Sequence, residues 1–347
     1  MSGYSIFRFQ AARRSNSVRN GSQFGFTLIE LMIAMLLGLI VIGGVISVFI
    51  AGQRSYATNK ALGDVQDGSR IAFEMMARDI RDAGLTGCGN GNRVANVLNN
   101  SATAWWAEWG NAVHGYGAGT ATVDPALVGL NQVSGTDSLQ LLGASDSGLS
   151  VAATPSSTAA NFKLNDKTSD LTTGDVIIVC DPDHAAIVQV TKYTDSNVTV
   201  VHNAGGSTVP GNCSKGLGYP TLCTANGNGY QFGPNSQIFK LAAVDWYIGT
   251  NPAGGTSLYR VSVNTVGGAP VAKAQEMVRD VTLMNIRYHQ AGSASFVDAA
   301  TVGTNWAAVD AVQVKLTLDS ADKGAGTNGK PISRNFTATT TVRNRVQ

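Results

Sequence analysis

One segment constrains the fold of this chain more than any other. The run Phe26–Ala51 contains a single charged residue, Glu30. A helix of this length is about 39 Å long, which exceeds the roughly 30 Å hydrocarbon core of a bilayer. A buried helix of a globular domain is rarely apolar on every face over such a length. The segment therefore predicts a membrane-spanning helix, which we place at residues 26–52.

The charges are unevenly distributed around this span. The chain has 25 Lys+Arg, 23 Asp+Glu and a net charge of +2, while residues 1–25 carry four arginines and no acid. The rest of the chain is therefore slightly acidic, which argues against a nucleic-acid partner bound through a basic surface. Four arginines before the span, against Arg54 and Lys60 just after it, predict an N-terminus inside and a head outside.

The helix is predicted to continue beyond the membrane as an amphipathic half, residues 53–84. No proline interrupts it before its end. Apolar or small residues recur at spacings of three and four: Phe73, Met76, Ala77, Ile80 and Gly84. Charged residues of alternating sign recur at every fourth position, as on a solvent-facing stripe: Arg70, Glu74, Arg78 and Asp82. Gly84 is suited to end the helix.

Residues 85–347 are predicted to form a β-rich globular head. Gly/Asn/Ser/Thr-rich loops separate short runs typical of strands. These runs are Ser138–Leu142, Asp175–Val179, Ala186–Val190, Val198–Val201, Val244–Ile248, Leu258–Val263, Val278–Tyr288, Val312–Leu318 and Phe336–Val342. Helical crossovers between them are missing, which favours antiparallel pairing. The predicted fold class is α+β, a long N-terminal helix packed on a mostly antiparallel sheet.

All four cysteines, Cys88, Cys180, Cys213 and Cys223, follow the apolar segment. An even number of cysteines in an exported domain favours disulfides, and three pairings are open. Cys213 and Cys223 bracket a Gly/Pro-rich loop, so we favour Cys213–Cys223 and hence Cys88–Cys180. The cysteines and histidines lack the spacing of metal ligands, and no metal or cofactor is expected.

Candidates for catalysis or ligand binding are few. Asp181, Asp183 and His184 in CDPDHAAI could form a carboxylate–histidine site, but Asp-Pro between two strand-like runs is a turn signal. Trp105, Trp106 and Trp109 could bind a glycan or cover the sheet, and the stretch 101–135 is either a short helix or a loop. Hydrolase, metalloprotease and phosphate-loop motifs do not occur. We therefore expect no catalytic residues and no small-molecule substrate.

The string Gly25-Phe26-Thr27-Leu28-Ile29-Glu30, after a basic leader and before a long apolar helix, resembles the class III signal of type IV pilins and type II secretion pseudopilins. In that family a prepilin peptidase cuts after the glycine and N-methylates the new first residue. The resemblance implies a cleaved leader, residues 1–25, and a methylated Phe26. Glu30 would pair with the amine of Phe26 in a neighbouring subunit. The alternative is an interfacial carboxylate without an assembly role.

Later segments resemble the PilW type of minor pilin. They are residues 52–90, with Arg-Asp-Ile-Arg followed by Ala-Gly-Leu-Thr-Gly-Cys, then residues 174–181, 309–316 and 341–345. The resemblance implies a subunit anchored in the inner membrane with a periplasmic head, later placed near the pilus tip. Implied partners are other minor pilins, the major pilin, a tip adhesin, the prepilin peptidase and the assembly platform. A J-type pseudopilin at the tip of a secretion pseudopilus is the alternative.

Overall fold

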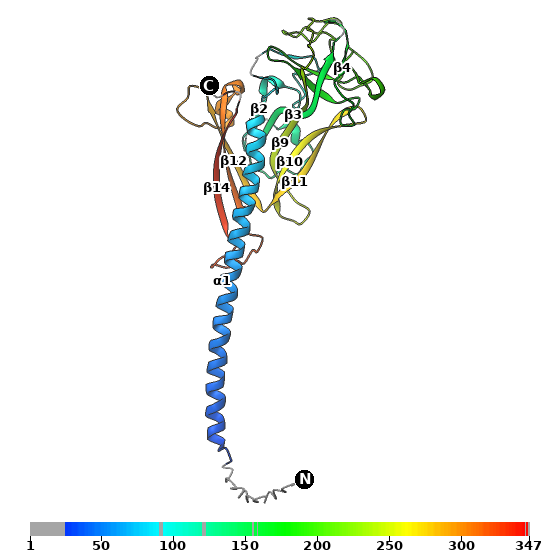
Figure 1. The fold of residues 1–347 in the computed structure, drawn as a ribbon. Helices are drawn as coiled ribbons and strands as arrows, with labels where there is room; N and C mark the ends of the chain where they lie inside the picture. The colour runs from blue at the N-terminus through cyan, green and yellow to red at the C-terminus, as the bar shows by residue number, and fades with distance from the viewer. Residues whose placement is uncertain are drawn as a thin grey trace, which may run out of the picture. The chain divides into compact units, whose positions relative to one another are not determined.

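The computed structural model describes residues 25–89, 93–119, 123–154, 156–157, 159–343 and 345. Residues 1–24, which make up nearly all of the expected leader, lie outside the described residues. The chain divides into two compact units, residues 1–56 and residues 57–347. One helix, α1 (Leu28–Asp82), contributes to both units (Figure 1). Its 55 residues confirm the prediction of a single helix longer than fifty residues.

In the first unit, α1 begins directly after Thr27. The Thr27 carbonyl accepts a hydrogen bond from the backbone N–H of Leu31 at 3.1 Å, and the Thr27 hydroxyl accepts one from the N–H of Glu30 at 3.3 Å. Thr27 therefore caps the helix N-terminus. Every side chain from Gly25 to Tyr56 is exposed. This part of α1 is long and apolar enough to cross a membrane.

In the second unit, the remaining turns of α1 bury one stripe. Its buried residues lie three or four positions apart: Ala61, Val65, Ser69, Ala72, Met76 and Ile80. Of the predicted stripe, Met76 and Ile80 are buried and Phe73 and Ala77 are half-buried at its margin. Arg70 and Glu74 form an exposed ion pair at 2.8 Å, as expected for the solvent side. Gly84, two residues after the helix, has a φ of 74°.

The described residues form two β-sheets. The larger has 11 strands, of which eight follow the order β1-β6-β5-β9-β3-β4-β8-β7, while β10 pairs with β9 and β11, and β2 pairs with β3. The strands are β1 (Val94–Asn96), β2 (Val113–Tyr116), β3 (Ser138–Ala153), β4 (Asn161–Leu164), β5 (Val176–Cys180), β6 (Ala185–Gln189), β7 (Lys192–Thr194), β8 (Thr199–Val201), β9 (Gln237–Thr250), β10 (Thr256–Val266) and β11 (Ala269–Arg279). Their pairings are antiparallel except for β1 with β6. The α+β prediction is confirmed.

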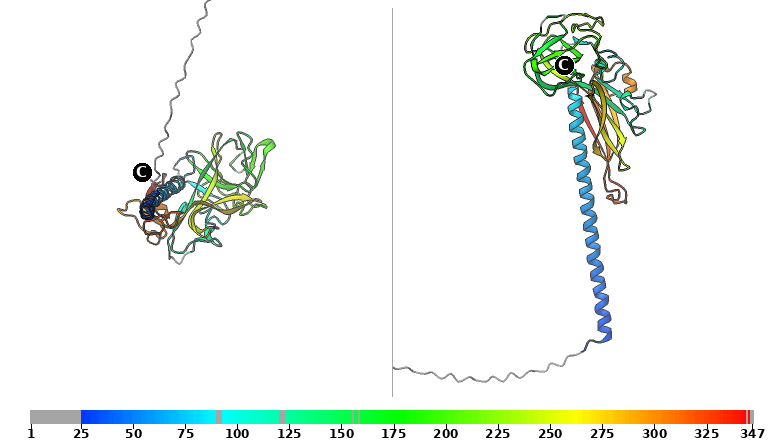
Figure 2. Two further views of the ribbon diagram at one scale, coloured as in Figure 1. Left: turned by 90° about the horizontal axis from the view of Figure 1, so that it is seen from below. Right: turned by 90° about the vertical axis from the view of Figure 1, so that its right-hand side faces the viewer.

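The smaller sheet has three antiparallel strands in the order β12-β13-β14. They are β12 (Val281–Gln290), β13 (Val309–Asp319) and β14 (Ser333–Thr341). Figures 1 and 2 show the later turns of α1 beside these orange-to-red strands. The main core explains this arrangement, because the buried helix stripe packs against both sheets there, with Trp246 from β9 and Val314 from β13 among its members. A second core consists mainly of buried side chains from β3, β4, β5, β6 and β8.

The prediction of one strand over Val278–Tyr288 is wrong. The chain leaves the larger sheet at the end of β11 and enters the smaller sheet at β12, with Asp280 between them at a φ of 60°. The Asp280 N–H donates to the carbonyl of Thr256, and its carbonyl accepts from the N–H of Asp319. The sequence did not reveal this change of sheet, because residues typical of strands lie on both sides of Arg279 and Asp280.

Short helices and irregular segments complete the head. They are η1 (Trp109–Asn111), η2 (Pro125–Leu127), η3 (Asp195–Asn197), α2 (Ala299–Val302) and η4 (Trp306–Ala308). The stretch 101–135, for which a short helix or a loop was expected, contains turns, η1, η2 and the strand β2. The strand was not recognised because only four residues, VHGY, form it, and a glycine lies inside that run.

Candidate functional site

The expected cleavage site lies in an exposed segment ahead of α1. Gly25, Phe26 and Thr27 precede the helix, and the Phe26 side chain is 83% exposed. Two residues therefore separate the Gly25–Phe26 bond from the first helical residue. A bond in such a segment is open to a peptidase, since extended exposed backbone can enter an active site without local unfolding.

Glu30 lies in the first turn of α1, three residues after the capping Thr27. Thr-x-x-Glu at a helix start has the spacing of a capping box, in which the Thr side chain caps the N–H of the Glu. A carboxylate in the first turn also interacts favourably with the positive end of the helix dipole. This local role of Glu30 was not predicted, although the string Thr27-Leu28-Ile29-Glu30 displays its signal.

Asp79 connects α1 to the larger sheet and was not identified from the sequence. Its Oδ2 accepts hydrogen bonds from Arg260 Nε at 2.8 Å and from Trp246 Nε1 at 2.9 Å, and its Oδ1 accepts from Arg260 Nη2 at 3.2 Å. The side chains of Arg260 and Asp79 are 29% and 17% exposed. The apolar periodicity of the helix gave no sign of this contact, because Asp79 reads as one more charged residue among Arg78, Arg81 and Asp82.

The register of the sheet brings the two partners of Asp79 together. Arg260 on β10 lies directly opposite Trp246 on β9, so both side chains point to the same face. The Arg260 guanidinium carbon lies 5.9 Å from the centre of the Trp246 ring. One helix carboxylate thereby contacts two neighbouring strands, which sets where the helix lies on the sheet.

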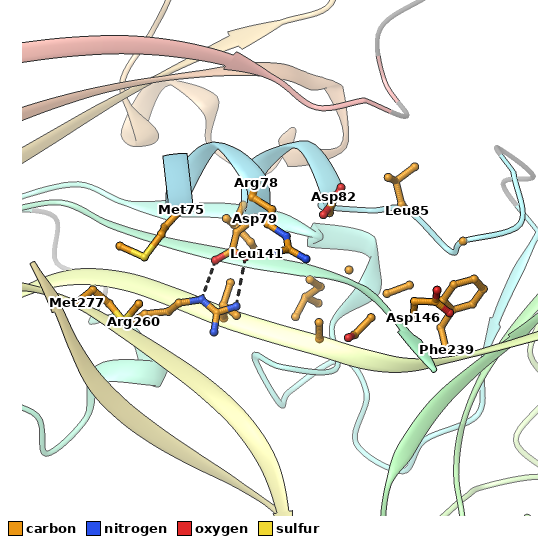
Figure 3. A pocket seen from close by; sticks show the side chains of 17 residues that line it. Met75, Arg78, Asp79, Asp82, Leu85, Leu141, Asp146, Phe239, Arg260 and Met277 are labelled. Carbon is orange, nitrogen blue, oxygen red and sulfur yellow. Dashed lines mark hydrogen bonds and ion pairs between the residues drawn. The ribbon is translucent and has the colours of Figure 1, made fainter. Parts of the chain in front are cut away.

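A groove of about 520 Å³ runs beside this contact (Figure 3). Met75, Asp79 and Asp82 line it from α1, and Phe239, Arg260 and Met277 line it from the strands. Its charged side chains carry both signs, and Asp79 and Arg260 already satisfy each other. The Asp79–Arg260 pair is therefore not free to bind a charged small molecule, and the lining does not present a single sign of charge.

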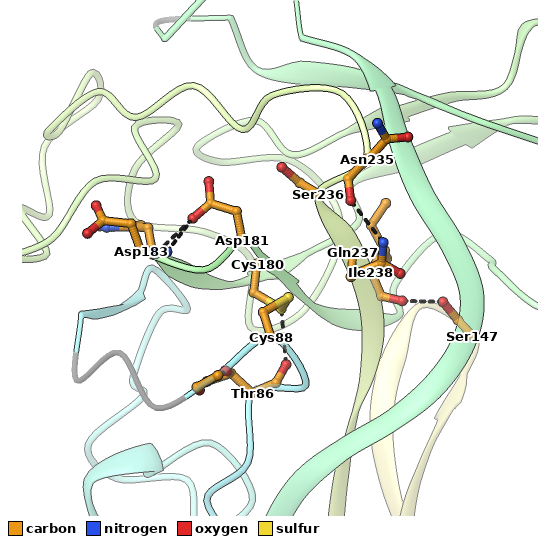
Figure 4. Close-up of a disulfide and its surroundings, with 12 residues drawn as sticks. Thr86, Cys88, Ser147, Cys180, Asp181, Asp183, Asn235, Ser236, Gln237 and Ile238 are labelled. Atoms are coloured by element: carbon orange, nitrogen blue, oxygen red, sulfur yellow. Dashed lines mark hydrogen bonds between the residues drawn. A yellow bond between two sulfur atoms is a disulfide. The ribbon is translucent and has the colours of Figure 1, made fainter.

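The structure contains two disulfides, Cys88–Cys180 and Cys213–Cys223, the same pairs that the sequence favoured. The first joins the segment that leaves α1 to the last residue of β5, as Figure 4 shows. The second closes a loop of the 203–236 region. The two bonds close loops of 92 and 10 positions, and so restrict the conformations open to the unfolded head.

Asp181, Asp183 and His184 form a turn. The Asp181 Oδ1 accepts hydrogen bonds from the N–H groups of Asp183 at 3.0 Å and His184 at 2.9 Å. The His184 ring stacks on Tyr230, and its Nε2 lies 3.0 Å from the Leu217 carbonyl. Burial lowers the pKa of His184, so its ring is biased toward the neutral form. The Asp183 carboxylate pairs with Arg93 at 3.0 Å, so each of the three side chains has a partner among the described residues.

Trp105, Trp106 and Trp109 cover the larger sheet. All three are half-buried and pack against the buried side chains of Leu142 and Ala243. This arrangement suits the covering role better than a glycan platform, which needs aromatic faces open to solvent. Within the described part of the chain, no group of three His, Cys, Asp or Glu side chains is placed to hold a metal ion.

Comparison with known families identifies the N-terminal segment. Residues 20–46 match the family model of the prokaryotic N-terminal methylation motif. No curated protein matches the chain. The matched motif and the long apolar helix that follows it support a class III signal protein, a type IV pilin or pseudopilin. They also support a membrane-anchored, structural protein associated with a pilus-type assembly machinery.

Proposed function

We propose that this chain is a minor pilin of the PilW type, which helps to initiate type IV pilus assembly and lies near the pilus tip. The observation that carries the proposal is the junction Gly25–Glu30, which falls inside the methylation motif at the start of α1. The same helix provides, in its later turns, the buried stripe of the β-rich head. One continuous helix therefore starts at the signal, provides the membrane span and packs on the head. This arrangement suits a subunit that moves from membrane to filament.

Processing is proposed to occur between Gly25 and Phe26, with methylation of the new amine on Phe26. Removal of the leader eliminates four arginines, whose transfer into an apolar helix bundle would be strongly unfavourable. It also creates a charged amine two residues ahead of α1. That amine needs an anionic partner once water is excluded, since an unpaired charge in a low-dielectric core is costly.

Glu30 is proposed to supply this partner from a neighbouring subunit. Its side chain is exposed, and none of the described residues forms an ion pair with it. Its own helix end favours a carboxylate, but the backbone N–H groups there do not neutralise a full charge. Pairing with an amine would both satisfy Glu30 and align two helices in register.

The exposed part of α1 from Leu28 to Ala51 is proposed to contact two different surroundings, one before and one after assembly. In the inner membrane it contacts lipid, with the head in the periplasm, and in the filament it contacts other pilin helices. Both surroundings are apolar, so the burial free energy changes little on transfer. The proposed partners are the prepilin peptidase, the assembly platform, other minor pilins, the major pilin and a tip adhesin.

The experiment follows one tagged chain through two cell fractions. Intact mass of the membrane form should show loss of residues 1–25 and gain of one methyl group. Immunoblots of sheared pili, normalised to the major pilin, should contain the protein at low stoichiometry. A mature form that begins after Gly52 would refute the proposal. A J-type pseudopilin would be favoured instead if the protein were absent from pili and cells lacking it failed to export secreted enzymes.

A further inference from the structure

A row of polar side chains crosses the buried interior of the larger sheet. Asp245 on β9 lies opposite Gln140 on β3, and Gln140 lies opposite His114 on β2. Asp245 is 0% exposed. A loop residue, Asp124, reaches the same place; it is 3% exposed and caps the short helix η2. Two carboxyl groups therefore share a site from which water is almost excluded.

Asp124 has the hydrogen bonds that an ionised carboxylate requires. Its Oδ1 accepts from Gln140 Nε2 at 2.5 Å and from the N–H of Ala126 at 2.9 Å. Its Oδ2 accepts from the hydroxyl of Ser138. An ionised carboxylate is an acceptor only, and three donors on two oxygens stabilise its negative charge.

Asp245 has much less support. Among the described residues, neither of its carboxyl oxygens meets the geometry of a hydrogen bond. The Gln140 side chain and the Leu139 backbone favour its ionised form, but less than burial and the Asp124 carboxyl oppose it. Burial raises the pKa of Asp245 well above its ordinary value, and the Asp124 carboxyl raises it further. The titratable groups that interact with this carboxyl pair are His114, Tyr116, Tyr247 and Tyr288.

None of these neighbours supplies a positive charge at neutral pH. Burial lowers the pKa of His114, and burial raises the pKa of Tyr247 to about 12, so both rings remain neutral there. Ionisation of Asp245 would place a second negative charge beside Asp124 in a dry site. An uncompensated buried charge is strongly unfavourable, which makes the protonated form of Asp245 the stable one.

We propose that Asp245 and Asp124 hold one proton between them and that this proton fastens residues 123–131 to the sheet. The hydroxyl of the protonated Asp245 then donates to Asp124, and the pair carries one negative charge. Loss of the proton leaves two facing carboxylates. Their repulsion acts on the loop that carries Asp124, because Asp245 is held within a central strand.

Release of this segment uncovers an apolar surface. Ala126 and Leu127 pack there on Tyr247 and Val261, and Trp105 packs against the same cluster. The head therefore has a device that responds to rising pH. Since the pKa of Asp245 is raised on folding, its contribution to stability is complete below the unfolded-state pKa of about 4 and is lost as pH rises from there through the folded-state pKa.

The test uses the full chain in nanodiscs and compares wild type with Asp245→Asn. Asparagine keeps the shape and donates to Asp124 but cannot ionise. The exposed Asp170→Asn serves as the matched control. Infrared spectra at pH 7 should show a protonated-carboxyl band that Asp245→Asn removes and Asp170→Asn retains. The ratio of wild-type to Asp245→Asn unfolding constants should rise about tenfold per pH unit above pH ~4, up to the folded-state pKa.

Hydrogen exchange at Ala126 and Leu127, corrected for the intrinsic rate, should accelerate with pH in the wild type and in the control, but not in Asp245→Asn. Parallel pH profiles for wild type and Asp245→Asn would overturn the proposal, as would absence of the carboxyl band from the wild type. If Asp245→Asn fails to fold, absence of a protonated-carboxyl band from the wild type at pH 7 still overturns the proposal. The proposal would also be overturned if Ca²⁺ alone raised the melting temperature of the wild type but not that of Asp245→Asn. A bound cation, and not a proton, would then join the two carboxylates.

Discussion

The carboxylate of Asp79 on α1 accepts hydrogen bonds from both Nε and Nη2 of Arg260 on β10, at 2.8 and 3.2 Å. A bidentate contact of this kind defines distance and orientation together. Trp246 Nε1 donates to the same carboxylate, so the helix is connected to two strands by one side chain. The adjacent apolar stripe supplies the attraction between helix and sheet, and Asp79 determines how far along the sheet the helix lies.

Asp79→Ala should lower the free energy of unfolding by about 2–3 kcal/mol, because it leaves the Arg260 guanidinium and the Trp246 N–H without their partner. Denaturant unfolding of the full chain in detergent measures this. Arg78→Ala, at the exposed neighbouring position, is the control and should change stability by less than about 0.5 kcal/mol. A double-mutant cycle with Arg260→Met should reveal coupling between the two sites; additive effects would contradict the contact's importance.

Glu30→Gln and Glu30→Ala separate the two roles of Glu30. Glutamine retains the capping-box spacing but loses the charge, while alanine loses both. If Glu30 pairs with a neighbour's amine, both variants should be processed and held in membranes normally yet be depleted from sheared pili to a similar extent. Immunoblots of pili and membranes measure this. Normal incorporation of both would identify Glu30 as an interfacial carboxylate, and loss in the alanine variant alone would indicate helix capping.

The two disulfides should contribute unequally to stability. In the chain-entropy description, loops of 92 and 10 positions correspond to about 4–5 and about 3 kcal/mol, respectively. Replacement of Cys88 and Cys180 together by serine should therefore cost more than replacement of Cys213 and Cys223. Unfolding of the two double variants measures the difference. Peptide mapping of the unreduced protein checks the pairing, and a Cys88–Cys213 peptide would contradict it.

His289 should strengthen the smaller sheet below neutral pH. Its Nδ1 lies 2.6 Å from an Asp310 carboxylate oxygen and its Nε2 lies 2.9 Å from the Ser293 carbonyl, so both nitrogens face acceptors. The hydrogen bond with Asp310 raises the pKa of His289. The stabilisation is complete below the unfolded-state pKa of about 6.5 and is lost as pH rises through the folded-state pKa.

An NMR titration of the histidine rings measures this effect. His289 should titrate above pH ~6.5. His202, whose pKa burial lowers to about 4, should stay neutral through the same range and serves as the internal reference. His289→Gln should remove the corresponding part of the pH dependence of unfolding. A His289 ring that titrates below its ordinary value would show that the Asp310 contact does not form in solution.

Local patterns in the sequence determined much of this protein. An uninterrupted apolar run, a helical periodicity and the string from Gly25 to Glu30 each depend on residues close together in the chain, so they predicted the span, the long helix and the signal. Most strands were located in the same way, because alternating β-branched residues suit a pleated surface wherever it lies. The cysteine pairs followed from spacing in a short loop, which left one remaining pair.

The tertiary structure decided what depends on distant residues. Asp79 meets Arg260 across 181 positions, and Asp124 meets Gln140 beside Asp245 only because three strands and a loop come together. Neither contact leaves a local pattern, since a charged residue on a helix or strand looks the same whether it faces water or a partner. The change of sheet at Asp280 is of this kind as well. Local spacing therefore determined the elements, and their packing determined which polar groups became buried and paired.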